Sequence, residues 1–187
     1  GGLGLWIEEY FLHLALLGLL MGLRPEERYG LDWEDVDLAG HVCHIHQAYL
    51  MVSRREGVHD LKEPKTELSR RDVPMPDDVA DALRDAPGAH SGPVLVGAGG
   101  GRVSPSTARH RWSRFLGWCD AEGIDVPHVT IENQRHSFAT SYLHAGGRVE
   151  DLSRILGHAD IVTTYRRYVR PGYEDAARGV GGIVPRV

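Results

Sequence analysis

A long apolar segment near the start of the chain, followed at once by an arginine, constrains the fold more than any other feature. Residues 7–22 are apolar on almost every helical face, and this pattern predicts a helix buried among other elements. Its most apolar run, Leu14 to Leu23, is ten residues long, whereas a membrane-spanning helix needs about 20. The run follows Glu8 and Glu9 without a basic leader, so it is not a secretory signal as written. The rest of the chain must therefore wrap around this helix.

The composition supplies enough material for one domain with a short tail. The chain has 187 residues, of which 42% are apolar, and this suffices for a core of ordinary size. Its two cysteines, Cys43 and Cys119, are too few for a disulfide framework, which favours a reducing compartment. The composition therefore excludes two classes for the chain as a whole, a disordered tail and a disulfide-stapled mini-protein.

The order of the remaining segments predicts an α+β fold that is mainly α. Gly22 ends the first helix, and Pro25 suits the first turn of a short second helix. Three short strands at 42–52, 61–66 and 70–74 predict a three-stranded antiparallel sheet. Further helices are predicted at 77–86, 105–122, 131–145, 149–156 and 161–170, with N-terminal caps at Ser104 and Thr130.

Charge is distributed unevenly between the two halves of the chain. Residues 1–99 carry 9 basic and 17 acidic side chains, a balance of −8, while residues 100–187 carry 12 and 9, a balance of +3. Arginine makes up 19 of the 21 basic residues, and its planar fork matches phosphate oxygens two at a time. The net charge of −5 argues against a uniformly basic nucleic-acid binder but leaves room for a local anion site.

Arg135 lies in the middle of an apolar helical stripe. On a helix over 131–143, one face collects Ile131, Phe138, Ala139 and Tyr142. A charge on that face is costly unless it is paired. It is either a structural arginine bridged to a carboxylate such as Glu132 or Glu27, or part of a functional anion site.

Four other residues each have an ordinary interpretation when taken alone. Arg24 follows the apolar helix and could cap its end. Lys65 falls in a turn between predicted strands, His158 follows Gly157 at a helix end, and Tyr168 lies on an amphipathic helix. None of them identifies a function by itself.

Taken in order, the segments around these residues resemble the motifs of tyrosine recombinases, the phage integrase family. The matching segments are Gly22-Leu-Arg-Pro-Glu-Glu27 with Leu31-Asp-Trp-Glu-Asp-Val-Asp37, Pro64-Lys-Thr66 with Ser69-Arg-Arg-Asp-Val-Pro-Met-Pro76, Arg135-His-Ser-Phe-Ala-Thr140, and Leu156-Gly-His-Ala-Asp-Ile161 with Thr163-Thr164 and Tyr168. Order and spacing agree over roughly residues 10–170.

The resemblance implies site-specific DNA recombination without a metal or other cofactor. A tyrosine attacks a backbone phosphate, a 3′-phosphotyrosine forms, and a 5′-hydroxyl of a partner strand later reverses the step. By resemblance, Arg24 and Arg135 hold the non-bridging oxygens, Lys65 protonates the departing 5′-oxygen, and His158 bonds the phosphate. Tyr168 is then the nucleophile. Such residue types suit phosphoryl transfer, which depends on positioning and on charge stabilisation.

The sequence departs from the family pattern inside the second arginine motif and after the first. The family has a histidine three residues before the arginine, where this chain has Glu132, and a leucine just before it, where this chain has Gln134. Glu132 could pair with Arg135, act as a base toward the tyrosine, or repel the phosphate. Arg28 stands where the family tends to have an apolar residue.

A further departure concerns the nucleophile. The family tyrosine commonly lies nine residues after the histidine, which here is Arg167, whereas Tyr168 lies at ten. Either the loop after His158 absorbs the extra residue or the tyrosine is misaimed. Tyr165 is a weaker alternative.

Two arginine clusters are predicted to contact double-stranded DNA. Arg109, Arg111 and Arg114 lie on the helix over 105–122, and Arg166 and Arg167 lie beside the predicted nucleophile. A solvated surface is the alternative interpretation of the first cluster. By resemblance, the chain acts as a homotetramer on DNA, with a monomer as an alternative without DNA.

The expected organisation is an integrase-type catalytic domain over 1–170 and a C-terminal tail over 171–187 that protomers could exchange. The separate N-terminal DNA-binding domain of the family has no room before residue 10. The expected location is cytoplasmic, at the nucleoid. Alternative functions are a catalytically impaired DNA-binding relative and, from another class, a helical protein-interaction domain.

Overall fold

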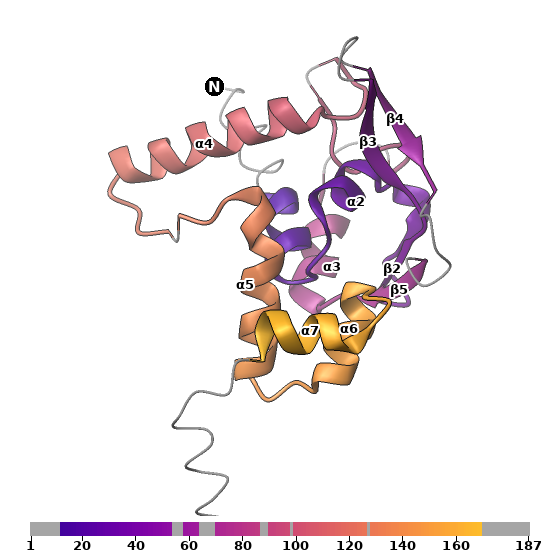
Figure 1. The fold of residues 1–187 in the computed structure, drawn as a ribbon. Coiled ribbons are helices and arrows are strands. Elements are labelled where there is room, and N and C mark those ends of the chain that lie inside the picture. The colour runs from indigo at the N-terminus through magenta and orange to yellow at the C-terminus, as the bar shows by residue number, and fades with distance from the viewer. Residues whose placement is uncertain are drawn as a thin grey trace, which may run out of the picture.

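A computed structural model describes residues 12–53, 58–63, 70–86, 90–97, 99–126 and 128–169. In Figure 1 the strands lie on one side of the molecule and the long helices on the other. Residues 12–19 are helical and sit between these two sides. The helices are α2 (Pro25–Gly30), α3 (Asp77–Arg84), α4 (Pro105–Ala121), α5 (Ile131–His144), α6 (Val149–Leu156) and α7 (Ile161–Tyr168), with a 3₁₀ turn at Trp33–Asp35.

Side-chain caps begin two of the predicted helices as expected. The Ser104 hydroxyl accepts a hydrogen bond from the Thr107 amide at 3.1 Å. The Thr130 hydroxyl accepts one from the Asn133 amide at 3.2 Å. Such caps satisfy amides that have no partner inside the helix. Both helix starts are therefore confirmed.

In the part of the chain that the structure describes, five short strands form two separate antiparallel sheets. They are β1 (Val36–Asp37), β2 (Val42–Ile45), β3 (Ala48–Ser53), β4 (Val58–Lys62) and β5 (Arg71–Pro74). A three-stranded sheet has the order β1-β2-β5, and β3 pairs with β4. The fold class is the predicted one. Within the three-stranded sheet, β2 and β5 fall in the strands predicted at 42–52 and 70–74, but the third strand is β1 and not the one predicted at 61–66.

The predicted single strand over 42–52 was wrong because the chain changes sheet at His46 and Gln47. The His46 ring lies 2.6 Å from Asp35 Oδ1. The Gln47 side-chain amide donates to the Gly30 carbonyl at 2.8 Å and to Asp32 at 3.0 Å. These contacts hold the chain against the end of α2, so β2 and β3 join different partners.

The helical segment 12–19 supplies side chains to two of the hydrophobic clusters. Leu17 packs into the cluster under the three-stranded sheet and α3, where Val73 and Leu83 are fully buried. Leu14 packs into a second cluster with Trp112 of α4 and Ile131 of α5. The predicted central position of this helix is confirmed for the described part, although Leu12 is 46% exposed.

Gly22 allows the chain to turn sharply out of this segment. Its φ is +66°, a left-handed conformation that glycine adopts without strain. A Cβ there would lie 2.3 Å from Cδ1 of Phe138 on α5. The Phe138 ring therefore packs directly against the backbone at Gly22, which places the residues after Gly22 next to α5.

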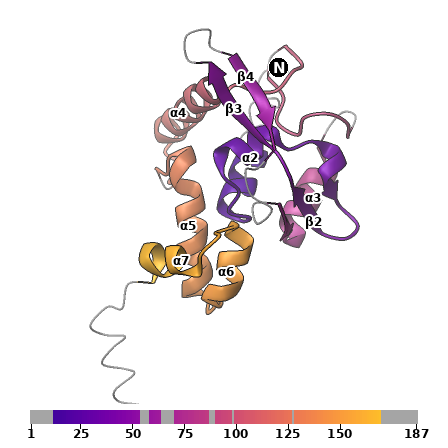
Figure 2. The ribbon, with the colours of Figure 1, turned by 45° about the vertical axis from the view of Figure 1, so that its right-hand side comes forward.

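Helices α5, α6 and α7 form a compact group at one end of the molecule (Figure 2). A third cluster joins them through Ala139, Leu152 and Leu156, with Tyr168 packed against it. Helix α6 ends at Gly157, whose φ is +63°, and α7 ends at Tyr168 rather than at residue 170 as predicted. The predicted tail over 171–187 lies outside the described residues.

Leu83→Ala tests the main core. The change leaves a cavity at a fully buried site, so we expect a loss of about 2–5 kcal/mol of unfolding free energy, measured by urea denaturation. The matched control is Leu12→Ala at a half-exposed site, which should change stability by no more than about 0.5 kcal/mol. Equal losses in the two variants would contradict this account of the core.

Candidate phosphate-binding site

The carboxylate of Glu27 is the centre of a cluster of arginines. It is 5% exposed and lies on α2. Arg71 of β5 donates from Nη1 to Oε1 and from Nη2 to Oε2, both at 2.9 Å. The Arg24 amide donates to Oε2 at 2.8 Å. Glu27 thus joins the start of α2 to the last strand of the sheet.

Glu27 is ionised despite its burial. Burial acts to raise the pKa of this carboxyl, but the hydrogen bonds and charge of Arg71, together with the charge of Arg135, outweigh it. The pKa therefore lies below its ordinary value. The site holds a permanent negative charge at neutral pH.

Arg135 projects from α5 into the same cluster. It is 7% exposed, and it donates to the carbonyls of Gly22 at 3.0 Å and Leu156 at 2.6 Å. Its Nη1 lies 3.9 Å from Glu27 Oε2. Burial lowers the pKa of Arg135 to about 10, so it remains charged at neutral pH. Of the two carboxylates considered from the sequence, Glu27 is the one it faces.

Arg24 completes the cluster from the N-terminal end of α2. Its side chain is 33% exposed, and its Nη1 lies 3.5 Å from Glu27 Oε1. The three guanidinium groups of Arg24, Arg71 and Arg135 carry three positive charges against the one negative charge of Glu27. Two positive charges are therefore left to attract an anion, and Arg24 is the most accessible of the three.

His158 extends the cluster towards α7. Its Nε2 lies 3.3 Å from Arg135 Nη2, and its Nδ1 lies 2.8 Å from the Thr164 hydroxyl. Because a guanidinium can only donate, Nε2 accepts and Nδ1 carries the proton. Burial and the nearby charge of Arg135 lower the pKa of His158 to about 4, so the ring is neutral at pH 7.

Tyr168 is the tyrosine that the structure brings to this cluster. Its ring is parallel to that of His158, with centroids 6.4 Å apart, and 5.1 Å from the ring of His136. Tyr165 is 43% exposed on the same helix. At the ten-residue spacing, the Tyr168 ring therefore lies beside the ring of His158.

Glu132 does not pair with Arg135, contrary to one expectation from the sequence. Its Oε1 accepts a hydrogen bond from Arg109 Nε of α4 at 2.7 Å, and both side chains are about half exposed. Burial acts to raise the pKa of Glu132, but the hydrogen bond and charge of Arg109, a backbone hydrogen bond and the charge of Arg28 together lower it. This ion pair ties α4 to the first turn of α5.

The remaining predicted residues are distributed as follows. Lys65 lies outside the described residues. Arg109 and Arg114 are exposed on α4, where Arg111 is half-buried, while Arg166 and Arg167 are exposed on α7. Helices α4 and α7 lie at opposite ends of α5 in both ribbon views (Figures 1 and 2). Arg167 is close enough to lower the pKa of His158, whereas Arg109 pairs with Glu132 at the other end of α5.

Arg71 is a member of the site that the sequence analysis missed. Its side chain is 7% exposed and also donates from Nε to the Ile155 carbonyl at 2.6 Å. The signal was its position: in β5 it shares a face with Val73, which is fully buried. An arginine in register with a core valine predicts a buried partner.

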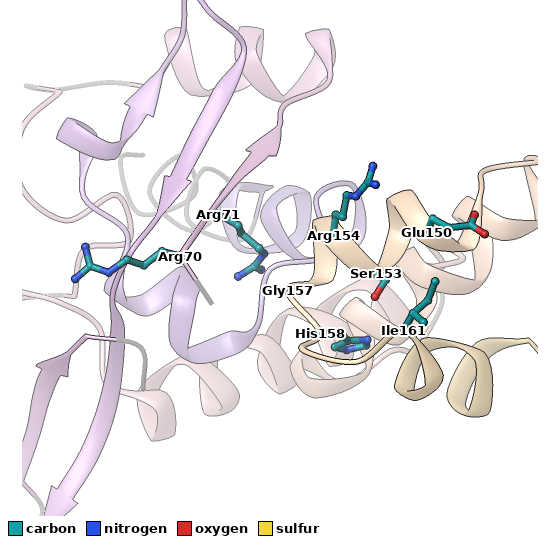
Figure 3. Close-up of a pocket in the computed structure, with 8 residues that line it drawn as sticks. All are labelled: Arg70, Arg71, Glu150, Ser153, Arg154, Gly157, His158 and Ile161. Atoms are coloured by element: carbon teal, nitrogen blue, oxygen red, sulfur yellow. The ribbon is translucent and has the colours of Figure 1, made fainter. Parts of the chain in front are cut away.

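A cavity of about 550 Å³ opens between β5 and the α6–α7 turn, beside Arg71 and His158 (Figure 3). Its lining residues are Arg70, Arg71, Glu150, Ser153, Arg154, Gly157, His158 and Ile161. Arg70 and Arg154 are held by Glu63 at 2.7 Å and Asp151 at 3.2 Å. The cavity borders the Glu27 cluster but is not lined by Arg24 or Arg135.

The described residues contain no group of three or more His, Cys, Asp or Glu side chains placed to hold a metal ion. Nor is any helix among them long and apolar enough to cross a bilayer.

The sequence model of the phage integrase family matches residues 8–175. The match spans Arg24 and Arg135, which lie beside Glu27, His158, which contacts Arg135, and Tyr168, whose ring lies beside that of His158. The chain belongs to the phage integrase family. The alternative of a helical protein-interaction domain would require the motif matches to be coincidental, and the family match argues against it.

Curated relatives are longer than this chain. An integrase of Streptomyces ambofaciens is 29% identical over 91% of this chain and 48% of its own length. Tyrosine recombinase XerC of Chlorobaculum tepidum is 30% identical over 80% of this chain and 43% of its own length. The chain thus spans about half the length of the curated relatives it matches.

Solved structures share the fold. The Tn1549 transposon integrase in complex with circular intermediate DNA matches with a TM-score of 0.76 at 23% identity, covering 95% of this chain and 60% of that one. XerA recombinase matches with a TM-score of 0.64 at 23% identity, covering 96% and 60%. These likenesses confirm the predicted α+β, mainly α class.

The environment of His158 predicts an unusual titration. NMR-monitored titration should place its pKa at about 4, against an ordinary value of 6.5. Since the unfolded chain then takes up the proton first, the contribution of His158 to stability is complete above pH 6.5 and is lost as pH falls towards 4.

The variant Arg167→Gln tests whether nearby positive charge lowers the pKa of His158. Arg167 is one of the charges that lower the pKa of His158, so removing it should raise that pKa. Arg148→Gln is the control, because that side chain is 75% exposed and lies near Glu150. A midpoint at the ordinary value, or no rise in Arg167→Gln, would contradict the described geometry.

Proposed function

We propose that this chain is the DNA-cleaving domain of a site-specific recombinase, which breaks and rejoins strands through a 3′-phosphotyrosine. The observation that carries the proposal is the convergence of Arg24, Arg135 and His158 on one cationic cluster with Tyr168 at its edge. Membership of the phage integrase family supports it.

The proposed cleavage step moves one phosphoryl group from the 5′-oxygen to tyrosine. The Tyr168 oxygen bonds to phosphorus and gives up its proton to solvent, while the bond from phosphorus to the 5′-oxygen breaks. Lys65 supplies the proton that the departing oxygen needs. A covalent 3′-phosphotyrosine and a free 5′-hydroxyl result, and the 5′-hydroxyl of a partner strand reverses the step.

The charges at the site suit this step. A phosphodiester carries one negative charge, and its non-bridging oxygens gain more as the fifth bond forms. The two unneutralised positive charges of the cluster would stabilise that increase. Arg24 and Arg135 are the proposed ligands of these oxygens. Arg24, which is 33% exposed, has a fork that can donate two parallel hydrogen bonds, whereas Arg135 already donates to two carbonyls and contributes mainly its charge.

His158 acts as a hydrogen-bonding group in this proposal. A pKa of about 4 makes it too weak a base to remove the tyrosine proton efficiently at neutral pH. A bound phosphate would offset the repulsion from Arg135 and raise the pKa of the ring, which favours donation to a phosphate oxygen.

Double-stranded DNA is the proposed partner, contacted by Arg109, Arg111 and Arg114 of α4 and by Arg166 and Arg167 of α7. Their distribution at both ends of α5 suits a surface that follows the backbone on either side of the cleaved phosphate. Assembly as a homotetramer, a location at the nucleoid, a catalytic domain over 1–170 and an exchangeable tail over 171–187 belong to the same proposal.

A catalytically silent DNA-binding relative is the second candidate. The observation that favours it is Glu132, a carboxylate engaged by Arg109 where the family has a histidine. Both candidates require DNA binding, and only the first requires a covalent adduct.

Covalent trapping separates the two. Wild-type protein incubated with a nicked duplex should give a DNA adduct on a denaturing gel, and Tyr168→Phe should abolish it because the attacking oxygen is gone. The matched control is Tyr165→Phe, one helical turn away and 43% exposed, which should leave the adduct at the wild-type level.

Two other outcomes of the trapping experiment would contradict the proposal, and each has its own explanation. An adduct that persists in Tyr168→Phe and vanishes in Tyr165→Phe would identify Tyr165 as the nucleophile. Salt-sensitive DNA binding with no adduct in any variant would support the silent relative.

Glu132→Gln tests the ion pair with Arg109. The variant releases a guanidinium for a phosphate contact, so DNA binding should tighten and the slope of log K against log salt should steepen by about 0.9. Asp78→Asn, which removes the same charge from an exposed position on α3, is the control and should leave the slope unchanged. An equal change of slope in both variants would show that net charge, and not release of Arg109, causes the tighter binding.

A further inference from the structure

Arg28 is a fully buried guanidinium that contacts two other helical segments. Its exposed fraction is 0%. From α2, its Nη1 donates to the Leu14 carbonyl at 2.9 Å and to Gln134 Oε1, and its Nη2 donates to the Ile131 carbonyl at 2.8 Å. One side chain thus connects α2 to the helical segment 12–19 and to the first turn of α5.

The charge of Arg28 has only neutral acceptors. None of the ion pairs within the described ranges includes it, and its Nε has no hydrogen-bond partner there. Burial lowers the pKa of Arg28 to about 10, so the group still carries its charge at neutral pH. A buried cation of this kind costs stability, and an apolar residue of similar volume is often at least as stable.

Gln134 and Gly18 fit this guanidinium. Gln134 is also fully buried, and Arg28 is the partner of its side-chain oxygen. A Cβ on Gly18 would lie 2.4 Å from both Arg28 Nη1 and Gln134 Oε1, so glycine leaves the room that the pair needs. The two departures from the family pattern at positions 28 and 134 are therefore one interaction.

This pair lies directly behind the phosphate-binding cluster. Gln134 precedes Arg135 in α5, and the Arg28 amide donates to the Arg24 carbonyl at 3.0 Å. Glu27 precedes Arg28 and lies 3.9 Å from the Arg135 guanidinium. A shift of α5 against α2 would therefore change the spacing of both phosphate ligands, and misplacement by about 1 Å can cost 100-fold in rate.

We propose that Arg28 is a positioning residue for DNA strand cleavage, which acts through its hydrogen bonds to α5 and to residue 14 to hold Arg135 beside Arg24. The inference rests on the proposed function, since it concerns the rate of the same cleavage step. A residue that served only packing would not need a buried charge, because an apolar side chain of similar volume is often at least as stable.

The test compares single-turnover cleavage with DNA affinity. Arg28→Leu, at saturating protein and well below its melting temperature, should cleave a nicked duplex at least tenfold more slowly than wild type. Its Kd for the same DNA should stay within twofold, because Arg28 is buried and touches no ligand. Leu83→Ala is the control, since it weakens the core at a site in α3 and should leave the rate constant of the folded protein unchanged.

Two further variants test the geometry and the pairing. Arg28→Lys keeps the charge but has one nitrogen in place of a fork, so it should restore less than half of the lost rate. Melting temperatures of Arg28→Leu, Gln134→Leu and the double variant should be non-additive, with the double variant more stable than Gln134→Leu alone. That variant leaves the buried charge without its side-chain acceptor.

The outcomes separate this inference from the proposed function. If wild type forms the adduct and Arg28→Leu cleaves as fast, or is slowed only as much as its Kd rises, the positioning role is overturned and the proposed function stands. Full rescue by Arg28→Lys or additive melting temperatures would also overturn it. A wild type that forms no adduct overturns both.

Discussion

A single buried carboxylate makes the rest of the site possible. Arg24, Arg71 and Arg135 come from separate parts of the chain, and without Glu27 their like charges would repel one another at close range. Glu27 neutralises one charge and fixes Arg71 by paired hydrogen bonds. Because it belongs to α2 and Arg71 to β5, the same ion pair also fastens the sheet to the helical side of the fold. The anion site is therefore assembled before any anion is bound.

Backbone carbonyls, like the Glu27 carboxylate, accept hydrogen bonds that hold the buried arginines in place. Arg135 is held by the carbonyls of Gly22 and Leu156, which lie where two helical segments end. Carbonyls at such ends lack partners inside the helix and carry partial negative charge. They can stabilise a buried cation without neutralising it, so the positive charge remains available to a ligand. Arg28 is also held by backbone carbonyls, but those of Leu14 and Ile131 lie inside and at the start of helical segments rather than at their ends.

Local patterns predicted the elements better than the contacts between them. Caps at Ser104 and Thr130 located two helices, because capping depends on neighbouring residues. The break at His46 depends on Asp35, and the partnership of Arg28 with Gln134 joins positions 106 residues apart. No periodicity records such pairs. Motif resemblance predicts Arg24, His158 and Tyr168, and Arg135 is also indicated by its place in an apolar helical stripe. Arg71 is indicated only by its register with Val73 in β5.

The hydrogen bond from His158 to Thr164 has a mechanical consequence. Thr164 lies on α7, the helix that carries Tyr168, and His158 contacts Arg135 through its other nitrogen. Displacement of α7 would break the hydrogen bond between His158 and Thr164. The His158 ring would then be free to rotate away from the Arg135 guanidinium. In the proposed reaction, the position of the Tyr168 phenol and the support of Arg135 would therefore depend on the same imidazole. A chain with α7 displaced would then lose the nucleophile and a contact of a phosphate ligand together.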